Sequence, residues 1–391
     1  MRERGRSSQF RKKKVLFIAS HWVNGGMERS LKTIIENMSP EWERELVILR
    51  RIKTKIAEEK MGGFPYPKNS KITLIEAGTI ITIFFSLIKL FKEREPHLIS
   101  THITPTGNLM LLVYLAKKLA GISGPIVVTN HDTLVLPADE LITYPFRKYV
   151  LKKGVDYIIT VSHSLEKVVV ENWKIPKEKV MTIYNPIVED AMFENLLEPP
   201  EYKAYPDCLK IVSVGRLDLD TKDFFTLLKA FSLFHKDVEN SKLFIIGEGP
   251  DRGRIEKEIK RLKLEDSALL LGARLNPYPY IKYAHIFVHS SFVEALGRTI
   301  VEAMALGCPV VAGDCPFGPR ELIGDNENGI LVPMGNPSAM AEAMKKVLDD
   351  EELRNKIIKN GLKKAEEFRL PLSIRKRENL FNKLLRGRYK G

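Results

Sequence analysis

The feature that most constrains the fold of this chain is a regular alternation between short apolar runs and longer segments with a helical pattern. The apolar runs that we expect to be strands lie at residues 15–20, 46–49, 98–101, 126–129, 157–161 and 180–183. A continuously apolar strand fits burial on both faces, and helices between such strands fit a parallel sheet. The first half of the chain therefore predicts a parallel sheet with helices on both sides.

The same alternation begins again near residue 209. The strands expected there are residues 209–214, 243–246, 268–271, 286–289 and 310–312. Between the halves, residues 186–208 contain Pro186, Pro199, Pro200 and Pro206, which suits a linker. The sequence thus predicts an α/β protein of two Rossmann-like, doubly wound parallel-sheet domains that face each other across a cleft.

The expected domain boundaries follow from this restart. Residues 1–13 are expected to form a basic disordered arm, 14–185 the N-terminal domain, 186–208 the linker and 209–369 the C-terminal domain. Helices are expected from about Met27 and Lys222 and, near the end, at 337–369 and 373–388. We expect the last segment, 370–391, to pack back on the N-terminal domain.

Positive charge is concentrated in the first half. Residues 1–185 hold 30 Lys and Arg against 18 Asp and Glu, whereas residues 186–391 hold 32 against 31. This asymmetry indicates an anionic partner for the first half: nucleic acid, a membrane surface or a phosphorylated substrate. A basic tail with scattered solvated lysines is the alternative. No nucleic-acid recognition module is visible, and the strongest motifs lie in the neutral half, so no nucleic acid is expected.

Cysteine usage and hydropathy indicate a cytoplasmic protein. Cys208, Cys308 and Cys315 form neither a disulfide framework nor a zinc spacing. Charges interrupt every apolar run before the roughly 20 residues that a membrane span needs. The apolar run after the basic N-terminus, residues 15–19, is shorter than the core of a secretory signal.

Two glycine-containing turns follow expected strands. Gly25 and Gly26 come between the first strand and its helix, where a helix start favours an anion, although a plain turn explains them equally well. Gly215 and Arg216 end the strand at 209–214, and Lys222 stands at the next helix start. Two cations at the carboxyl end of a parallel strand suit a diphosphate, with ordinary surface charges as the alternative. The pair Asp218 and Asp220 is discounted as a metal motif.

The sharpest motif joins two glutamates across a helix start. Glu294 lies in a loop after a strand, and Glu302 lies inside the following helix. Seven residues separate the two glutamates. Gly297 marks the beginning of that helix, so the backbone N–H groups of Gly297–Thr299 are free to bind an anion. Two carboxylates beside a positive helix end suit the hydroxyls on either side of a phosphate, as in a nucleotide sugar. A surface glutamate and a loop charge are the alternative.

Together with further motifs, these residues resemble those of a known family. The additional stretches are Gly247–Pro250, Leu271-Gly272, Asn276–Tyr280, Asp314–Glu321 and Asn328–Pro333. In this order the chain resembles the retaining nucleotide-sugar glycosyltransferases of the GT-B fold, the family-4 type or glycosyl transferases group 1. The likeness covers essentially the whole chain. The Asp-Cys-Pro-x-Gly-Pro-Arg-Glu stretch is similar to enzymes that build surface glycans and lipid-linked oligosaccharides, often from UDP-hexoses or UDP-N-acetylhexosamines.

The resemblance implies a role for each matching residue. Arg216 and Lys222 would bind the donor diphosphate, Glu302 the ribose hydroxyls and Glu294 the donor sugar, the last with the loop 295–297. Gly25 and Gly26 would face the diphosphate from the N-terminal domain, and the loop 272–276 would border the base. The donor-binding residues implied are Gly25, Gly26, Arg216, Lys222, Arg274, Glu294, Leu296, Gly297, Arg298, Thr299 and Glu302.

The chemistry implied by the resemblance is a metal-independent hexosyl transfer with retention and without a covalent protein nucleophile. The catalytic residues implied are His131, Glu294, Arg216 and Lys222. His131 matches the histidine beside the donor sugar and the attacking hydroxyl; a loop histidine with a structural role is the alternative. His102 is a weaker candidate for acceptor contact. No cofactor is implied, because the nucleotide-diphosphate sugar is a co-substrate.

Three positions depart from or blur the family pattern. Ala295 and Leu296 stand where the family has Gly or Ser and Phe, which leaves the identity of the sugar open. His285 stands where the family often has Asp, at a strand start, and says little.

The N-terminal domain of this fold would hold the acceptor, a glycan or a lipid-linked sugar. Residues 80–91 place Ile80, Ile81, Phe84, Phe85, Ile88 and Phe91 on one helical face. That face either packs on the domain's own sheet or touches an anionic membrane. The basic residues 147, 148, 152 and 153 follow Tyr144 and Phe146 and would add electrostatic attraction. The location expected is cytoplasmic, peripheral on the inner face of the membrane.

Two other readings keep the same fold. A nucleotide-sugar 2-epimerase would bind the donor without an acceptor, and an inactive partner subunit would bind neither productively. The intact set of Arg216, Lys222, Glu294 and Glu302 favours an active glycosyltransferase over both.

Overall fold

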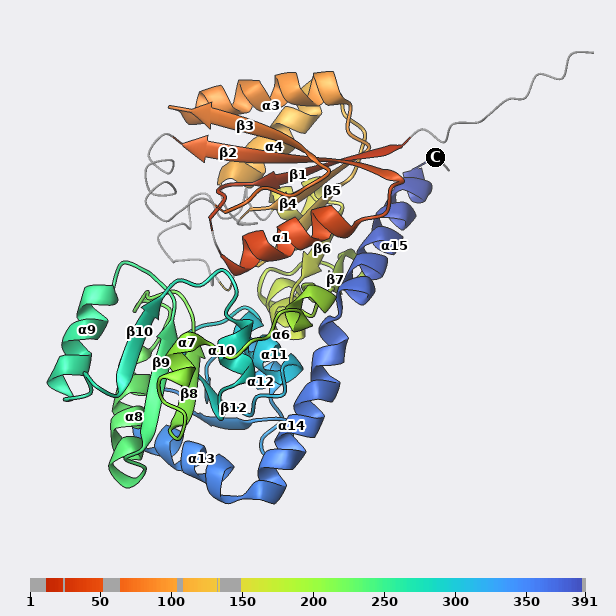
Figure 1. Cartoon of the computed structure of the whole chain (residues 1–391). Coiled ribbons are helices and arrows are strands. Elements are labelled where there is room, and N and C mark those ends of the chain that lie inside the picture. The colour runs from red at the N-terminus through yellow and green to blue at the C-terminus, as the bar shows by residue number, and fades with distance from the viewer. Residues whose placement is uncertain are drawn as a thin grey trace, which may run out of the picture. The chain divides into compact units, whose positions relative to one another are not determined.

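The structure is a computed structural model that describes residues 12–23, 25–51, 64–103, 108–131, 133 and 149–388 (Figure 1). The chain divides into two compact units. The first comprises Met1–Thr160, Glu166–Ile183 and Ile374–Gly391, and the second comprises Val161–Leu165 and Tyr184–Ser373. The expected basic arm lies outside the described residues except for its last two, Lys12 and Lys13.

The described part of the first unit is built on a seven-stranded, fully parallel sheet in the order β3-β2-β1-β4-β5-β6-β7. Its strands are β1 Lys13–Ala19, β2 Trp42–Arg51, β3 Lys71–Ala77, β4 Leu98–His102, β5 Ile126–Asn130, β6 Tyr157–Thr160 and β7 Val180–Thr182. The central strands β4 and β5 are buried along their whole length, both their apolar first residues and their polar carboxyl ends, Ser100–His102 and Thr129-Asn130.

Helices cover both faces of the first sheet. They are α1 Gly26–Asn37, α3 Ile80–Arg94, α4 Asn108–Ala120 and α15 Leu370–Arg388, the last of which belongs to this unit from Ile374 onward. In Figure 1, α3 and α4 lie on one face and α1 on the other. Helix α3 begins at Thr79, whose hydroxyl accepts the N–H of Thr82. It packs Ile83, Leu87 and Phe91 into the core.

The second unit carries a six-stranded parallel sheet in the order β10-β9-β8-β11-β12-β13 over the residues described. Its strands are β8 Leu209–Val214, β9 Ser241–Ile246, β10 Ala268–Gly272, β11 Ile286–His289, β12 Val310–Asp314 and β13 Ile330–Pro333. Its helices are α6 His163–Lys167 (within the unit as far as Leu165), α7 Pro200–Lys203, α8 Phe224–Asp237, α9 Arg252–Arg261, α10 Tyr278–Lys282, α11 Arg298–Ala305, α12 Gly318–Leu322, α13 Pro337–Asp349 and α14 Glu351–Ala365.

Two buried clusters, one on each face, hold the second sheet in place. One combines Phe244 and Phe287 with α11, and the other combines Leu243 and Val288 with α8 and α13. The predicted fold class is confirmed: both sheets are parallel, Rossmann-like and part of an α/β architecture.

The structure corrects some predicted elements. Strands β3 and β13 were not predicted, because Lys71, Thr73 and Glu76 interrupt the apolar residues of β3 and β13 is a four-residue run that ends at Pro333. The single helix predicted at 337–369 is two helices, because Asp350 ends α13 and its carboxylate accepts the N–H of Leu353 at the start of α14. The segment expected as a linker holds α7 and a 3₁₀ turn, and its Tyr202 is fully buried.

Among the residues that the structure describes, no helix is both long enough and apolar enough to cross a membrane.

Candidate active site

In the second unit, the strand order reverses between the adjacent strands β8 and β11. Open α/β sheets bind ligands beyond the carboxyl ends of their strands, at this reversal. Strand β8 ends at Val214 and is followed by Gly215 and Arg216, and β11 ends at His289 and leads to Glu294. The strongest sequence motifs therefore meet at the position where this fold binds ligands.

The loop after β8 is held against the loop after β9. Gly215 N–H donates to Ile246 O at 3.0 Å, and Leu217 N–H donates to Glu248 O at 3.0 Å. A Cβ on Gly247 would lie 1.8 Å from Gly215 O, so only glycine permits this approach. The loop then ends at Asp223, whose carboxylate accepts the N–H of Thr226 and caps α8.

The same loop pairs with the segment after β11. Asp223 N–H donates to Ser290 O at 3.2 Å, and Phe292 N–H donates to Thr221 O at 3.0 Å. These contacts bring Lys222 to Glu294, and its Nζ pairs with Glu294 Oε1. Both side chains are largely buried, with 18% and 16% of their surface exposed. The structure therefore joins two residues that are 72 positions apart in the sequence.

Glu294 Oε1 has two further partners. His289 Nε2 lies 3.2 Å away, and Ser291 Oγ lies 3.2 Å away. Burial by itself would raise the pKa of Glu294, but the charge of Lys222 and the hydrogen bond from His289 outweigh burial and hold that pKa far below its ordinary value. Glu294 is thus a carboxylate at every physiological pH.

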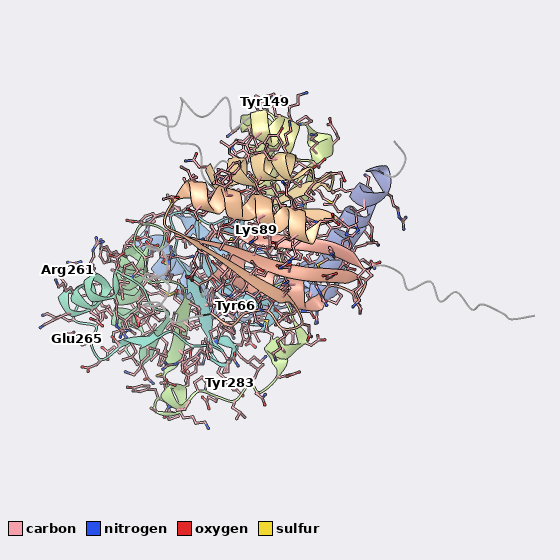
Figure 2. All side chains as sticks on the ribbon, turned by 90° about the horizontal axis from the view of Figure 1, so that it is seen from above. Tyr66, Lys89, Tyr149, Arg261, Glu265 and Tyr283 are labelled. Atoms are coloured by element: carbon pink, nitrogen blue, oxygen red, sulfur yellow. The ribbon has the colours of Figure 1, made fainter. Side chains whose placement is uncertain are left out.

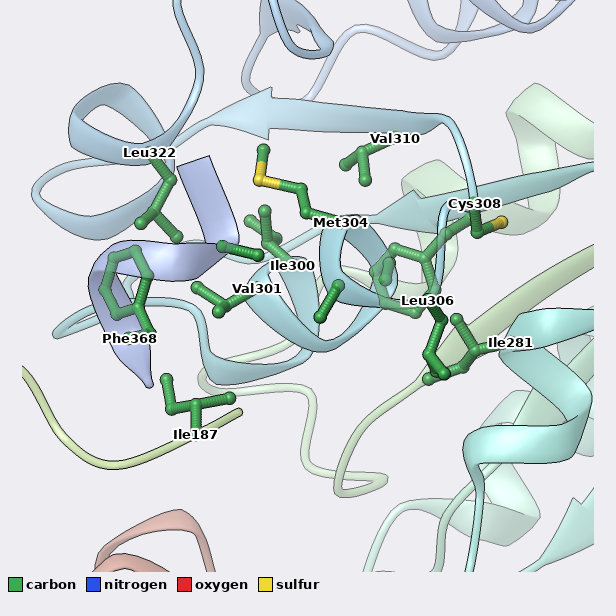
Figure 3. Close-up of a cluster of buried hydrophobic side chains, with 14 of the residues drawn as sticks. Ile187, Ile281, Ile300, Val301, Met304, Leu306, Cys308, Val310, Leu322 and Phe368 are labelled. Carbon is green, nitrogen blue, oxygen red and sulfur yellow. The ribbon is translucent and has the colours of Figure 1, made fainter. Parts of the chain in front are cut away.

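Helix α11 begins beside this cluster. Its N-cap residue is Gly297, whose backbone lies in the left-handed region with φ 88°. Because glycine has no side chain, the cap residue offers no side-chain acceptor to the first N–H groups of the helix. The helix is anchored by Ile300, Val301 and Met304, which Figure 3 shows among other apolar side chains such as Phe368. Its first backbone N–H groups are positioned by the core and belong to a positive helix end.

Glu302 is buried inside α11 with Arg298. Arg298 Nε donates to Glu302 Oε1 at 2.8 Å, and the two side chains are 15% and 3% exposed. Burial tends to lower the pKa of Arg298, but the adjacent Glu302 raises it overall. The two side chains form a buried ion pair within one helix.

The other predicted donor-binding residues of this unit have varied surroundings. Arg216 is more than half exposed and pairs with Asp218. Arg274 donates to Glu201 at 2.9 Å and to the Tyr280 hydroxyl at 3.2 Å, so it tethers its loop to α7 and α10. The side chain of Leu296 is buried in the core, and Thr299 is half-buried at the start of α11.

In the first unit, Gly25 and Gly26 do begin a helix. Gly25 is the cap of α1, and Glu28 in the first turn is almost fully buried. Its Oε1 lies 3.1 Å from His21 Nε2, and a Cβ on Gly25 would lie 2.5 Å from its Oε2. The anion beside this helix start is therefore the chain's own carboxylate.

His131 and His102 meet at the carboxyl ends of β5 and β4. His102 Nδ1 and His131 Nε2 are 3.1 Å apart, and His102 is fully buried. Arg377 of α15 lies behind them, fully buried, and donates from Nη1 to Thr129 Oγ1 at 3.3 Å. Its Nε and Nη2 have no hydrogen-bond partner in the described structure.

Burial dominates the ionisation of this group. Burial and, to a smaller extent, the charge of Arg377 together lower the pKa of His131 to about 3. The pKa of His102 lies well below its ordinary value for the same reason, with His131 and Arg377 adding to the effect. The pKa of Arg377 falls to about 10, so the arginine is charged and the two imidazoles are neutral.

Sequence reasoning missed His289 and Arg377. A signal existed for each: His289 is a polar residue at the end of an apolar strand, and Arg377 falls between Ile374 and Phe381 on the buried face of α15. Residues 144, 146, 147 and 148, named above for membrane attraction, lie outside the described residues. In the part of the chain that is described, no cluster of three or more His, Cys, Asp or Glu side chains has a metal-binding arrangement.

Two family models match successive parts of the chain. Residues 24–191 match "Glycosyltransferase Family 4", and residues 197–364 match "Glycosyl transferases group 1". Together they span most of the sequence, and each falls on one of the two sheets.

Known proteins are also similar to this chain over most of its length. One is the N-acetylgalactosamine-N,N'-diacetylbacillosaminyl-diphospho-undecaprenol 4-alpha-N-acetylgalactosaminyltransferase of Campylobacter jejuni, 29% identical over 88% of this chain and 93% of that protein. Another is an uncharacterized glycosyltransferase of Methanocaldococcus jannaschii, 26% identical over 81% and 86%.

A solved structure has the same fold. The crystal structure of Anabaena HepE in complex with UDP and glucose matches with a TM-score of 0.77 and 18% identity, over 95% of this chain and all of that one. This likeness shows the fold, and the two family models, which together cover most of the chain, show the family. The chain belongs to the glycosyltransferases of the GT-B fold, of the group 1 and family 4 type.

Proposed function

We propose that this enzyme moves a hexose or N-acetylhexosamine from a UDP sugar to a hydroxyl of a glycan or lipid-linked acceptor, with retention of configuration and without a metal. The observation that carries the proposal is the start of α11. Its cap, Gly297, has no side chain that could occupy the first N–H groups of the helix, and two buried carboxylates, Glu294 and Glu302, flank it.

This arrangement suits the parts of a nucleotide sugar. The helix start attracts a phosphate through its first N–H groups and its dipole. A carboxylate accepts hydrogen bonds from hydroxyls, so Glu294 on one side and Glu302 on the other match a sugar and a ribose. In support, Oε1 is the only oxygen of each carboxylate for which the described structure gives a partner, which leaves the other oxygen as an acceptor.

We assign the donor diphosphate to Arg216, Lys222 and the N–H groups of residues 297–299. Arg216 is more than half exposed and able to leave Asp218 for a phosphate. Positive groups beside the leaving diphosphate would offset the charge that develops there, which is how this site would accelerate transfer without a metal. Arg274 and the loop 272–276 are assigned to the base, with Arg274 held in place by Glu201 and Tyr280.

We assign acceptor binding to the first unit, over residues 14–185, and donor binding to the second, over residues 209–369. His131 would contact the reacting hydroxyl as a neutral imidazole, because burial and Arg377 keep its pKa low. His102 would orient it through the 3.1 Å contact between their rings. Gly25 and Gly26 are assigned to ligand contact through their backbone. The Campylobacter relative is named for a diphospho-undecaprenol acceptor, which supports a lipid-linked acceptor here.

The experiment that tests this proposal is a transfer assay. Purified enzyme in EDTA is given UDP-glucose, UDP-galactose or their N-acetylhexosamine counterparts with polyprenyl-diphosphate-linked sugars, and products are identified by mass and by the anomeric signals in NMR. Transfer is expected from one UDP sugar and to be lost in Glu302→Gln. The matched control is Glu327→Gln, an exposed carboxylate paired with Lys356, which should transfer normally.

The assay also separates the alternatives. A 2-epimerase would convert the UDP sugar without an acceptor. An inactive partner subunit would give neither product, and either result would contradict the proposal.

We further propose that the first unit docks on an anionic membrane through the outer face of α3. Ile81 and Phe85, one turn apart, are 66% and 63% exposed, and Lys89 follows on the same helix. Figure 2 shows Lys89 on this helix and Tyr149 at the margin of the same unit. The single apolar face expected over residues 80–91 is divided in the structure: Phe91 packs in the core with Ile83 and Leu87, whereas Ile81 and Phe85 lie on the outer side, which we assign to the membrane.

Vesicle flotation tests this docking. The protein should float with phosphatidylglycerol vesicles at low salt and less with phosphatidylcholine vesicles. Phe85→Ser should reduce flotation, whereas Leu119→Ser on α4, where the leucine is 62% exposed, serves as the matched control. Equal flotation of both variants, or none with the unmodified protein, would contradict the proposal.

A further inference from the structure

His289 is the one titratable side chain of the Glu294 cluster to which the proposed transfer assigns no role. It ends β11 and is 3% exposed. Its Nε2 lies 3.2 Å from Glu294 Oε1 and 3.1 Å from Ser291 Oγ. Its Nδ1 lies 3.4 Å from Thr299 Oγ1, in the first turn of α11. The ring therefore stands between the carboxylate and the helix start.

The hydrogen-bond network assigns the tautomer of this ring. Glu294 is ionised beside Lys222 and only accepts, so Nε2 must carry the proton that faces it. Nδ1 is then an acceptor, and the Thr299 hydroxyl donates to it. Burial lowers the pKa of His289 and the charge of Lys222 adds to this, while Glu294 opposes them. The ring is neutral at physiological pH, which this tautomer requires.

The three side chains around Glu294 all contact one oxygen. Lys222, His289 and Ser291 meet Oε1, and the described structure gives Oε2 no partner. Three donors on Oε1 fix the rotamer of Glu294 and determine that Oε2 is the atom available to a ligand hydroxyl. Lys222, in the loop after β8, supplies the positive charge that pairs with Glu294. His289, at the end of the neighbouring strand β11, orients the Glu294 carboxylate.

We propose that His289, itself held by Thr299, is a positioning residue that holds Glu294 beside Lys222, so that Glu294 Oε2 accepts a hydroxyl of the donor sugar. This inference rests on the proposed function, since it takes Glu294 as the sugar-binding carboxylate. It commits His289 to recognition of the sugar and not of the nucleotide. Its loss should therefore separate the two affinities.

The test compares UDP with the UDP sugar that the transfer assay identifies. Calorimetry on the full chain measures both affinities, and steady-state kinetics measures kcat and KM. His289→Leu removes both ring contacts at similar volume and should lower kcat/KM by about 10- to 100-fold, as expected for a lost hydrogen bond to a charged group. Affinity for the UDP sugar should fall, while affinity for UDP stays within about twofold.

Two further variants exclude a merely structural effect. His289→Gln keeps an N–H donor within reach of Glu294 and should recover most of the lost activity. His285→Asn changes an exposed histidine immediately before the same strand, whose Nδ1 accepts the N–H of Lys210, and should leave the sugar affinity unchanged. Thermal unfolding of each variant checks that it is folded.

The outcomes are distinct for the inference and for the proposed function. Equal kinetics in His289→Leu and the unmodified enzyme, or a parallel loss of UDP and UDP-sugar affinity, would overturn the inference alone. Binding of the UDP sugar without transfer would overturn the proposed function and still let the affinities decide about His289. No binding of any UDP sugar would overturn both.

Discussion

The two units each bury an arginine or lysine near the carboxyl ends of their central strands, but they treat its charge in opposite ways. In the second unit Lys222 pairs with Glu294 and Arg298 pairs with Glu302. In the first unit the fully buried Arg377 has one hydrogen bond, to Thr129, and faces two imidazoles. One cluster is compensated by carboxylates, and the other is tolerated because its neighbours are kept neutral.

A buried lysine or arginine can therefore raise or lower the free energy of unfolding, depending on whether a carboxylate pairs with it. Removing one partner of a buried ion pair leaves an isolated charge and costs about 3–5 kcal/mol. Removing a buried charge that has no carboxylate partner removes a desolvation penalty instead. Neutralising substitutions in the two units are therefore expected to have opposite signs.

The largest expected effect is that of Glu294→Gln. The change leaves Lys222 charged, mostly buried and unpaired, so the free energy of unfolding should fall by about 3 kcal/mol or more. Transfer should fall at least about 100-fold, because the amide replaces one of the acceptor oxygens with a donor. Urea unfolding and kcat/KM measure the two effects.

The control is the double variant Glu294→Gln with Lys222→Met, which removes both charges. It should regain most of the stability and none of the activity. If Glu294→Gln alone were as stable as the unmodified protein, the buried charge of Lys222 would not depend on Glu294, which would contradict the prediction for the second unit.

A smaller effect of opposite sign is expected for Arg377→Met. Methionine fills the space without a charge, so the free energy of unfolding should stay the same or rise by about 1–4 kcal/mol. Arg375→Met, at an exposed position of the same helix, is the matched control and should change stability by less than about 0.5 kcal/mol. A clear loss of stability in Arg377→Met alone would mean that the guanidinium is compensated in the native protein.

The smallest effect concerns acid stability and sharpens the comparison for the first unit. Folding lowers the pKa of His131 from about 6.5 to about 3, so between these values the unfolded chain binds a proton that the folded chain does not. Stability is therefore lost as pH falls through this window, by up to about 1.4 kcal/mol per pH unit for this residue. His131→Asn should lessen the slope between pH 6.5 and 5 in urea unfolding.

The measured range, pH 6.5–5, lies above the range in which ordinary carboxylates take up protons, so the slope there reports mainly on the histidines. The lowered pKa values of His102, His285 and His289 act in the same direction and leave a residual slope. An identical slope in the variant and the unmodified protein would show that His131 titrates normally in the folded state.

Much of the fold was predictable because it rests on apolar strands. Central strands such as β5 and β8 are rich in apolar β-branched residues and largely buried, and this pattern identifies them without further information. The edge strand β3 is half-exposed, and Lys71, Thr73 and Glu76 interrupt its apolar residues, so it lacks that signal. The helical pattern of apolar residues continues from α13 into α14, so it does not show where the first helix ends. The break is made by the Asp350 carboxylate, which accepts the N–H of Leu353.

The sequence named candidate residues for the site but not how they pair. Motif spacing identified Lys222, Glu294 and Glu302, yet it did not indicate that Lys222 would meet Glu294 and that Arg298 would meet Glu302. The first pair depends on how two loops cross, as at Thr221 and Phe292. The second is local, because Arg298 and Glu302 are four residues apart on one helix, a spacing that the sequence itself offers. Arg377 was missed because a charged residue on a helix is expected to face water.

The most direct test of the account is calorimetric titration of the full chain, in EDTA, with UDP, GDP and ADP and then with the sugar conjugates of the nucleotide that binds. The account predicts that UDP binds without metal, that saturation at about 100 times Kd raises the unfolding free energy by about 2.7 kcal/mol, and that Glu302→Gln abolishes this while Glu327→Gln does not. Absence of binding with every nucleotide and sugar conjugate, in a folded protein, would contradict it.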